Sequence, residues 1–193
     1  GSFLFHTYAN RWSLLADVIP ITVFIYAFFL LAMRRFLRLG WAAAGLLTAG
    51  FFGASAAFPA GWTALLGEGA TVNGSVSYFP AALALLAVGG LLVMIARRAE
   101  TVLANRKNKA WGVDDEHARA RAFLDKVAAP HEAGTALLLA AAVFSASLVF
   151  RSIDVAVCGW LPIGTHFLWH TLNAVVLFVL VRAAIRGRAG VGA

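Results

Sequence analysis

Residues 14–33 read LLADVIPITVFIYAFFLLAM, a stretch in which Asp17 alone is charged. A helix needs about 20 mostly apolar residues to cross a bilayer, so this stretch predicts a transmembrane helix. Four further stretches have the same character, and Pro59 and Gly61 are expected to end the first of them. These stretches are Trp41–Phe58, Tyr78–Ala96, Ala133–Phe150 and Ile163–Val181. The chain is therefore predicted to be an all-α, polytopic bundle with five full membrane spans, forming one membrane-embedded domain over residues 1–193.

The composition also indicates a membrane protein. Of the 193 residues, 61% are hydrophobic and only 13% are charged, and the mean hydropathy is +0.81. A soluble domain carries about a quarter charged residues, so a soluble domain of this size is excluded. Cys158 is the single cysteine, which excludes an internal disulfide framework and a thiolate metal cluster.

The basic residues are distributed unevenly between the two sides of the predicted bundle. Fourteen of the 16 Lys and Arg residues follow the first, third or fifth span, which places them on one side, whereas Arg11 and Arg151 lie on the other. The positive-inside rule then predicts a cytoplasmic C-terminus, in the plasma or inner membrane if the chain is bacterial. The net charge of +7 is explained by this topology, and no nucleic-acid partner is expected.

One long polar segment, residues 97–130, is predicted to connect two spans at the cytoplasmic surface. Its residues 114–127 predict a surface helix with Asp115/Arg119 and Arg121/Asp125 pairs four residues apart. A solvated connector is the favoured interpretation, and a regulatory or partner-binding element is the alternative.

Ionisable residues inside or beside membrane spans are costly, so they are functional candidates by default. His166 and His170 are four residues apart, which puts both imidazoles on one helix face where they can hold one metal ion. A catalytic zinc ion takes three protein ligands and a water molecule. His6 is the only other histidine expected on that non-cytoplasmic side, and the alternative for it is an interfacial hydrogen-bonding role.

Two further candidates lie close to His6 in the chain. Asp17 is expected at the top of the next helix, where its carboxylate can take a proton from a water that zinc acidifies; a helix cap or a partner for Arg11 is the alternative. Ser2 lies four residues before His6 and could donate to a developing oxyanion, or its hydroxyl could bond to its own helix carbonyls.

Several residues near the last two spans have simpler expected roles. Arg151 and Asp154 predict an ion pair at the membrane edge, with an indirect role in bracing the metal site as the alternative. Asn173 could orient an imidazole. The tryptophans Trp12, Trp160 and Trp169 are expected in the interfacial belt.

Three stretches together resemble the alkaline ceramidase family of seven-helix membrane amidases. They are GSFLFHTYANRWSLLADVIPI at the start, NGSVSYFPA in the middle and FRSIDVAVCGWLPIGTHFLWHTLNA near the end. The resemblance covers about the first 30 residues, residues 73–82 and residues 144–182, and elsewhere the match is in hydropathy alone.

The resemblance implies a zinc-dependent hydrolase that cleaves the amide of ceramide, or of a related lipid amide, into a fatty acid and a free amine. It implies His6, His166 and His170 as zinc ligands, Asp17 as the residue that handles the proton of the bound water, and Ser2 as an aid to the tetrahedral intermediate. It also implies that the first helix and most of the second of the family fold lie outside this sequence. The acidic segment that binds calcium in some branches is likewise not present, so no calcium is expected.

Two other functions are alternatives to the hydrolase. Adiponectin-type receptors share the superfamily fold and a three-histidine zinc site, which makes a zinc-binding membrane receptor the alternative. A haem-binding cytochrome would need histidines on opposite sides of an iron, and two histidines on one helix face fit zinc better.

Overall fold

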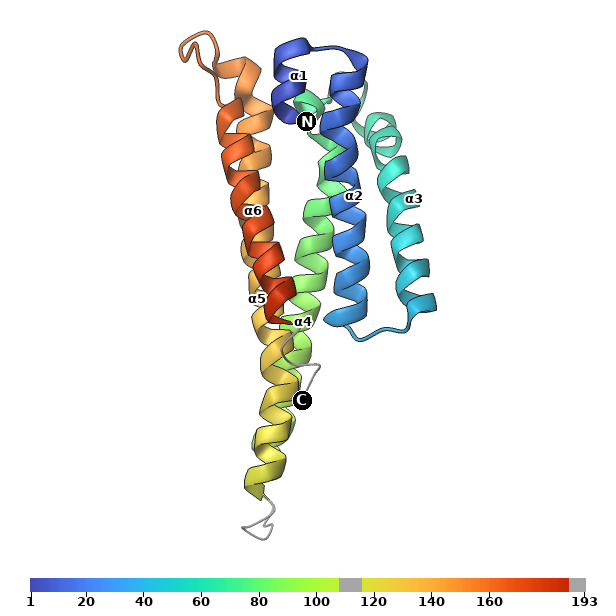
Figure 1. Cartoon of the computed structure of the whole chain (residues 1–193), viewed down its shortest axis with the longest axis vertical. Coiled ribbons are helices and arrows are strands. Elements are labelled where there is room, and N and C mark those ends of the chain that lie inside the picture. Colours follow the sequence, from blue (N-terminus) through green and yellow to red (C-terminus); the bar gives the residue numbers. More distant parts are fainter. Residues whose placement is uncertain (108–115, 188–193) are drawn as a thin grey trace. The chain divides into compact units, whose positions relative to one another are not determined.

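The computed structural model describes residues 1–107 and 116–187, and side chains within residues 1–101 and 130–187. All regular structure in these ranges is helical, as predicted (Figure 1). The helices are α1 (Ser2–Tyr8), α2 (Arg11–Arg35), α3 (Trp41–Leu66), α4 (Phe79–Lys107), α5 (Glu116–Val157) and α6 (His166–Arg186), with two short 3₁₀ turns, η1 (Val72–Gly74) and η2 (Val76–Tyr78).

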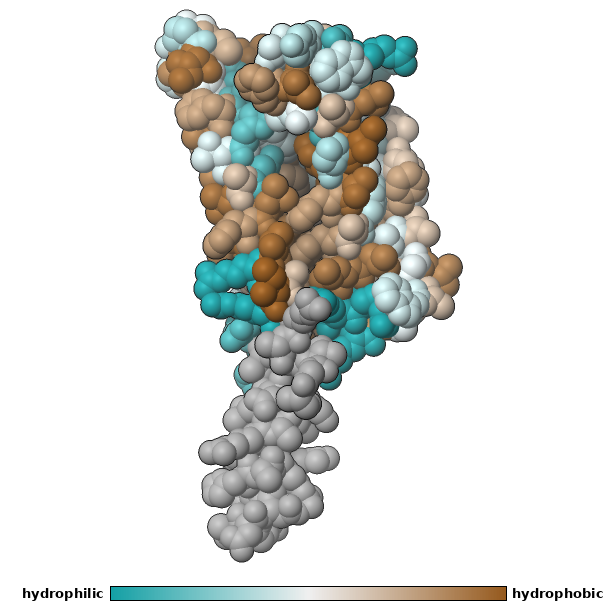
Figure 2. Space-filling model, viewed as in Figure 1, coloured by the Kyte–Doolittle hydropathy of each residue, from teal (hydrophilic) through white to brown (hydrophobic). Residues whose placement is uncertain are grey.

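Five of the described helices are long and apolar enough to cross a membrane, which confirms the number of predicted spans. Large apolar side chains lie on their outer surfaces; on α6, for example, Phe178 and Ile185 are largely exposed. Figure 2 shows apolar side chains over much of the visible helix surface. In water such surfaces would be costly, whereas lipid tails solvate them. The chain is an integral, multi-pass membrane protein.

The predicted helix ends differ from the observed ones at two places. Pro59 and Gly61 do not end the second span, because α3 continues through both to Leu66. Proline removes one backbone donor, the N–H that would bond to the Ser55 carbonyl one turn earlier, and helices that lie in a membrane tolerate this loss.

The polar segment over residues 97–130 is not built around a separate surface helix. Residues 97–107 continue α4, and residues 116–130 belong to α5, which runs through Pro130 into the span. The predicted Asp115/Arg119 and Arg121/Asp125 pairs lie outside the described side chains, as does His117.

By its internal contacts the chain forms two compact units, residues 1–53 and 54–193. In the first, Ala9 takes a left-handed conformation (φ 48°) and so turns the chain from α1 into α2. Asn10 caps α2 by accepting from the Ser13 backbone, and the fully buried Ser13 hydroxyl accepts from the Asn10 backbone, forming a capping box. The α2–α3 hairpin closes through aromatic contacts, including Phe29 on Phe51 with ring centres 4.5 Å apart.

In the second unit, α5 packs between α4 and α6. The α4–α5 crossing depends on two glycines, since a Cβ added at Gly134 would lie 2.9 Å from the carbonyl oxygen of Gly89. Small residues of this kind let membrane helices approach closely. Along the α5–α6 contact, Phe144 packs on Trp169, and the Ser147 hydroxyl lies 3.1 Å from the Asn173 side-chain oxygen. This packing holds the start of α6 against the end of α5.

Candidate metal site

The histidine pair lies at the first turn of α6. His166 is the first residue of the helix, His170 follows one turn later, and both side chains are half-buried. Their ring centres are 4.9 Å apart. Two imidazoles that bind one tetrahedral zinc ion through nitrogens at about 2.1 Å would have ring centres roughly 5 Å apart, so the observed pair fits that geometry.

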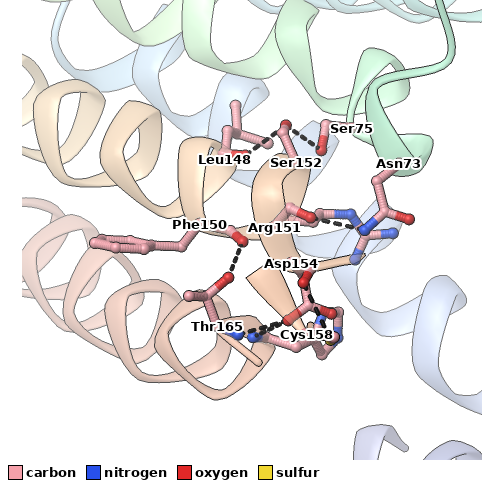
Figure 3. Close-up of polar contacts among 10 residues, drawn as sticks. Asn73, Ser75, Leu148, Phe150, Arg151, Ser152, Asp154, Cys158 and Thr165 are labelled. Carbon is pink, nitrogen blue, oxygen red and sulfur yellow. Dashed lines mark hydrogen bonds and ion pairs between the residues drawn. The ribbon is translucent and has the colours of Figure 1, made fainter. Parts of the chain in front are cut away.

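Asp154, at the end of α5, fixes the start of α6 (Figure 3). Its Oδ1 atom accepts hydrogen bonds from the backbone N–H groups of Thr165, at 2.6 Å, and His166, at 2.8 Å. These N–H groups have no carbonyl partner inside α6, so Asp154 acts as a cap supplied by the preceding helix. Its other oxygen, Oδ2, lies 4.0 Å from the Nδ1 atom of His166. At this distance the carboxylate is a close neighbour of the ring and does not accept a hydrogen bond from it.

The loop before α6 is shaped to receive this carboxylate. Gly164 has φ +63°, a conformation that side chains disfavour, and a Cβ there would collide with Oδ1 of Asp154. The Thr165 hydroxyl donates to the Phe150 carbonyl at 2.6 Å. The start of α6 is thus fixed to α5 by a backbone turn, a hydroxyl and a carboxylate.

The predicted ion pair between Arg151 and Asp154 is replaced by other contacts. The Arg151 guanidinium lies over the rings of Tyr78, at 5.3 Å, and Trp169, at 5.0 Å. The Asn73 side-chain amide donates to the Arg151 carbonyl at 2.8 Å. Because Asp154 is engaged by α6, the alternative interpretation, in which it braces the histidine pair, is the one that fits this geometry.

Two other expectations near the pair are corrected. The Asn173 side chain bonds to Ser147 on α5, so it joins the two helices and is not arranged around an imidazole. Trp169 is only 3% exposed and packs on Tyr78 and Phe144, so it is a core residue and not part of an interfacial belt. Trp12 and Trp160 are 53% and 76% exposed, which suits their predicted position at the membrane boundary.

The other three candidates, Ser2, His6 and Asp17, lie in the first unit. Ser2 and His6 are one turn apart on α1, and Asp17 is half-buried in the second turn of α2. Asp17 does not cap this helix, because Asn10 holds the cap position. Gly1 packs on Ala16 and Asp17 so closely that an added Cβ would collide with the Ala16 carbonyl. The α1–α2 hairpin therefore brings the start of α1, next to Ser2, against the turn of α2 that carries Asp17.

Asp154 has a larger part in the geometry than the sequence suggests. The distance in space between Asp154 and His166 depends on the turn at Gly164. The spacing of residues along one helix does not predict that distance. The available signal in the sequence is a single carboxylate nine residues before Ile163, where the histidine-bearing span is predicted to start.

No protein-family model, curated protein or solved structure matches this chain.

Proposed function

We propose that this protein is a zinc-dependent intramembrane amidase that hydrolyses ceramide or a related lipid amide to a fatty acid and a free amine. The observation that carries the proposal is the His166–His170 pair, with ring centres 4.9 Å apart at a helix start. Asp154 supports the proposal by holding the start of the helix that carries the pair, since its Oδ1 atom accepts a hydrogen bond from the His166 backbone N–H. His6 supplies the third nitrogen in this proposal.

Zinc suits the donor set better than haem does. Two imidazoles one turn apart on a single helix face converge on one point, whereas axial haem ligands must lie on opposite sides of the iron. Neutral nitrogen donors also avoid placing extra charged side chains in an apolar bundle. A zinc ion held by His6, His166 and His170 would polarise the amide carbonyl and acidify a water molecule near neutral pH.

Residues of the chain itself supply proton transfer, stabilisation of the developing charge and positioning of the imidazoles. The Asp17 carboxylate accepts a proton from the attacking water and delivers it to the amide nitrogen as the carbon–nitrogen bond breaks. The Ser2 hydroxyl donates a hydrogen bond to the carbonyl oxygen as negative charge develops there. Asp154 holds the start of α6, and so keeps both of its imidazoles in place. The substrate in this proposal is a lipid, because the site belongs to a membrane-embedded chain.

The types and spacings of the site residues in the sequence also support the proposal. Ser2, His6 and Asp17 with His166 and His170 match, in type and spacing, the residues that the alkaline ceramidase resemblance assigns to the site. The span order puts all five on the non-cytoplasmic side in the proposed topology, with the C-terminus in the cytoplasm.

The experiment is fatty-acid release, measured by mass spectrometry, from ceramides and other lipid amides by the purified protein in detergent. Wild type is compared with His170→Ala and with His131→Ala, a histidine of α5 that lies outside the candidate site. We expect release by wild type and His131→Ala, and its loss in His170→Ala. If wild type binds zinc yet releases no fatty acid from any amide, the amidase is wrong and the receptor-like alternative takes its place.

A further inference from the structure

A groove of about 680 Å³ lies on α4 and α5, within the second unit. One face of α4 forms most of it, through residues that recur at helical spacing, and α5 adds Leu138. The residues of this groove are Gly90, Val93, Met94, Arg97, Arg98, Thr101 and Leu138. Its volume falls in the range of about 300–1,000 Å³ that is typical of ligand pockets.

The groove changes character along its length. It is apolar from Gly90 to Met94 and basic at Arg97 and Arg98, where the candidate span of α4 ends at Thr101. Gly90, the first residue of the groove, and Arg97, its first basic residue, are about 10 Å apart along α4 at 1.5 Å per residue, and one leaflet's hydrocarbon is about 15 Å thick. A lipid with an acyl chain and an anionic headgroup matches this groove, because its apolar chain lies deeper in the membrane and its charged group lies at the surface.

The two arginines suit a phosphate. Both side chains are exposed, and neither forms an ion pair with any acidic side chain in the described part of the chain. Guanidinium groups bind phosphate oxygens through paired N–H donors. The Thr101 hydroxyl is already used, since it donates to the Arg97 carbonyl at 3.0 Å.

We propose that this groove binds an anionic phospholipid of the surrounding bilayer, with an acyl chain along Gly90, Val93 and Met94 and the phosphate on Arg97 and Arg98. This site is separate from the histidine pair, and the proposal does not depend on the amidase. Basic grooves between membrane helices are a recurring form of headgroup recognition. The simpler alternative is that both arginines only mark the helix end and attract anionic lipid without a groove.

Two kinds of variant separate these possibilities. Arg97→Gln/Arg98→Gln removes the charges, and its matched control is Arg182→Gln/Arg186→Gln, which removes two exposed charges from α6. Gly90→Leu fills the groove and keeps every charge. A Cβ at Gly90 meets nothing within 4 Å, so a side chain can leave the backbone there without a collision. Gly50→Leu on α3, where a Cβ also meets nothing within 4 Å, is its control.

The measurement is native mass spectrometry of the full chain, titrated with phosphatidylglycerol or with phosphatidylcholine of the same acyl chains. We expect wild type to prefer phosphatidylglycerol, and the Arg97/Arg98 double variant to bind it at least about tenfold more weakly, since it loses the paired N–H donors that hold the phosphate in the groove. Gly90→Leu should weaken both lipids, and both controls should match wild type. Inorganic phosphate should not compete, because it lacks the chain that the groove holds.

Three results would overturn the proposal. Equal loss in the Arg182/Arg186 control would show attraction by charge alone. Unchanged binding by Gly90→Leu would show that no chain lies in the groove. Competition by inorganic phosphate at concentrations similar to those of the lipid would show a headgroup site without a lipid groove.

Discussion

The carboxylate of Asp154 accepts a 2.8 Å hydrogen bond from the backbone N–H of His166, and its second oxygen lies 4.0 Å from the ring nitrogen Nδ1 of the same residue. One side chain of α5 thus sets both the start of α6 and the surroundings of its first imidazole. The geometry of the histidine pair is a property of the α5–α6 hairpin as a whole.

Asp154 is expected to affect stability and metal binding separately. Asp154→Ala removes the cap and should lower the free energy of unfolding by about 1–2 kcal/mol. It should also weaken zinc binding by about 10–100-fold. Asp154→Asn keeps an oxygen for the two N–H groups, so it should unfold like wild type but still bind zinc more weakly. Thermal unfolding measures the effect on stability, and zinc titration against a chelator measures the effect on metal binding. If Asp154→Ala and Asp154→Asn had the same stability and the same zinc affinity, the two effects would not be separate.

Gly164 is expected to be intolerant of a side chain. Gly164→Ala places a methyl group at φ +63° and against Asp154 Oδ1, so it should cost at least about 1 kcal/mol of unfolding free energy. Gly159→Ala, in the same loop region, is the control because a Cβ there meets nothing within 4 Å. Thermal unfolding of both variants measures the difference. The interpretation fails if Gly164→Ala is as stable as Gly159→Ala.

Arg151 is expected to act through its ring contacts with Tyr78 and Trp169. Arg151→Lys keeps the charge and loses the planar group, so it should lower stability by about 0.5–2 kcal/mol. A double-mutant cycle of Arg151→Ala with Asp154→Asn should give a coupling energy near zero, because the two side chains do not pair. A coupling well above about 0.5 kcal/mol would restore the ion pair that the sequence predicts.

The five spans could be predicted from the sequence because hydropathy alone determines which stretches can lie in lipid. The residues at which the helices end could not be predicted in the same way. Pro59 predicts a helix end in water, yet α3 passes through it, and the polar residues after Ala96 continue α4 where a separate connector is expected. Local composition does not record whether a helix continues beyond the membrane surface.

The candidate site was predicted only in part for a similar reason. The spacing of His166 and His170 follows from one helix and needs no tertiary information. The function of Asp154 depends on the turn at Gly164, and the burial of Trp169 depends on Phe144 and Tyr78 from other elements. Contacts between elements are not encoded by spacing within one element.

Asp17 is expected to be needed for turnover and not for metal binding. Asp17→Asn keeps the size of the side chain and removes its ability to accept a proton, so zinc content should match wild type while fatty-acid release falls by about 10²–10⁴-fold. Elemental analysis and the release assay are run on the same preparation. Release at the wild-type rate would show that another group moves the proton.

The most direct test of the zinc amidase is metal removal and return. The purified protein is stripped with a chelator, and fatty-acid release from the lipid-amide panel is measured before stripping, after it, and after zinc is restored. We predict release that disappears with the metal and returns with about one zinc ion per chain, as a single three-histidine site requires. Release that continues at the full rate in the stripped protein, or none from any amide in the protein that holds zinc, would contradict the account.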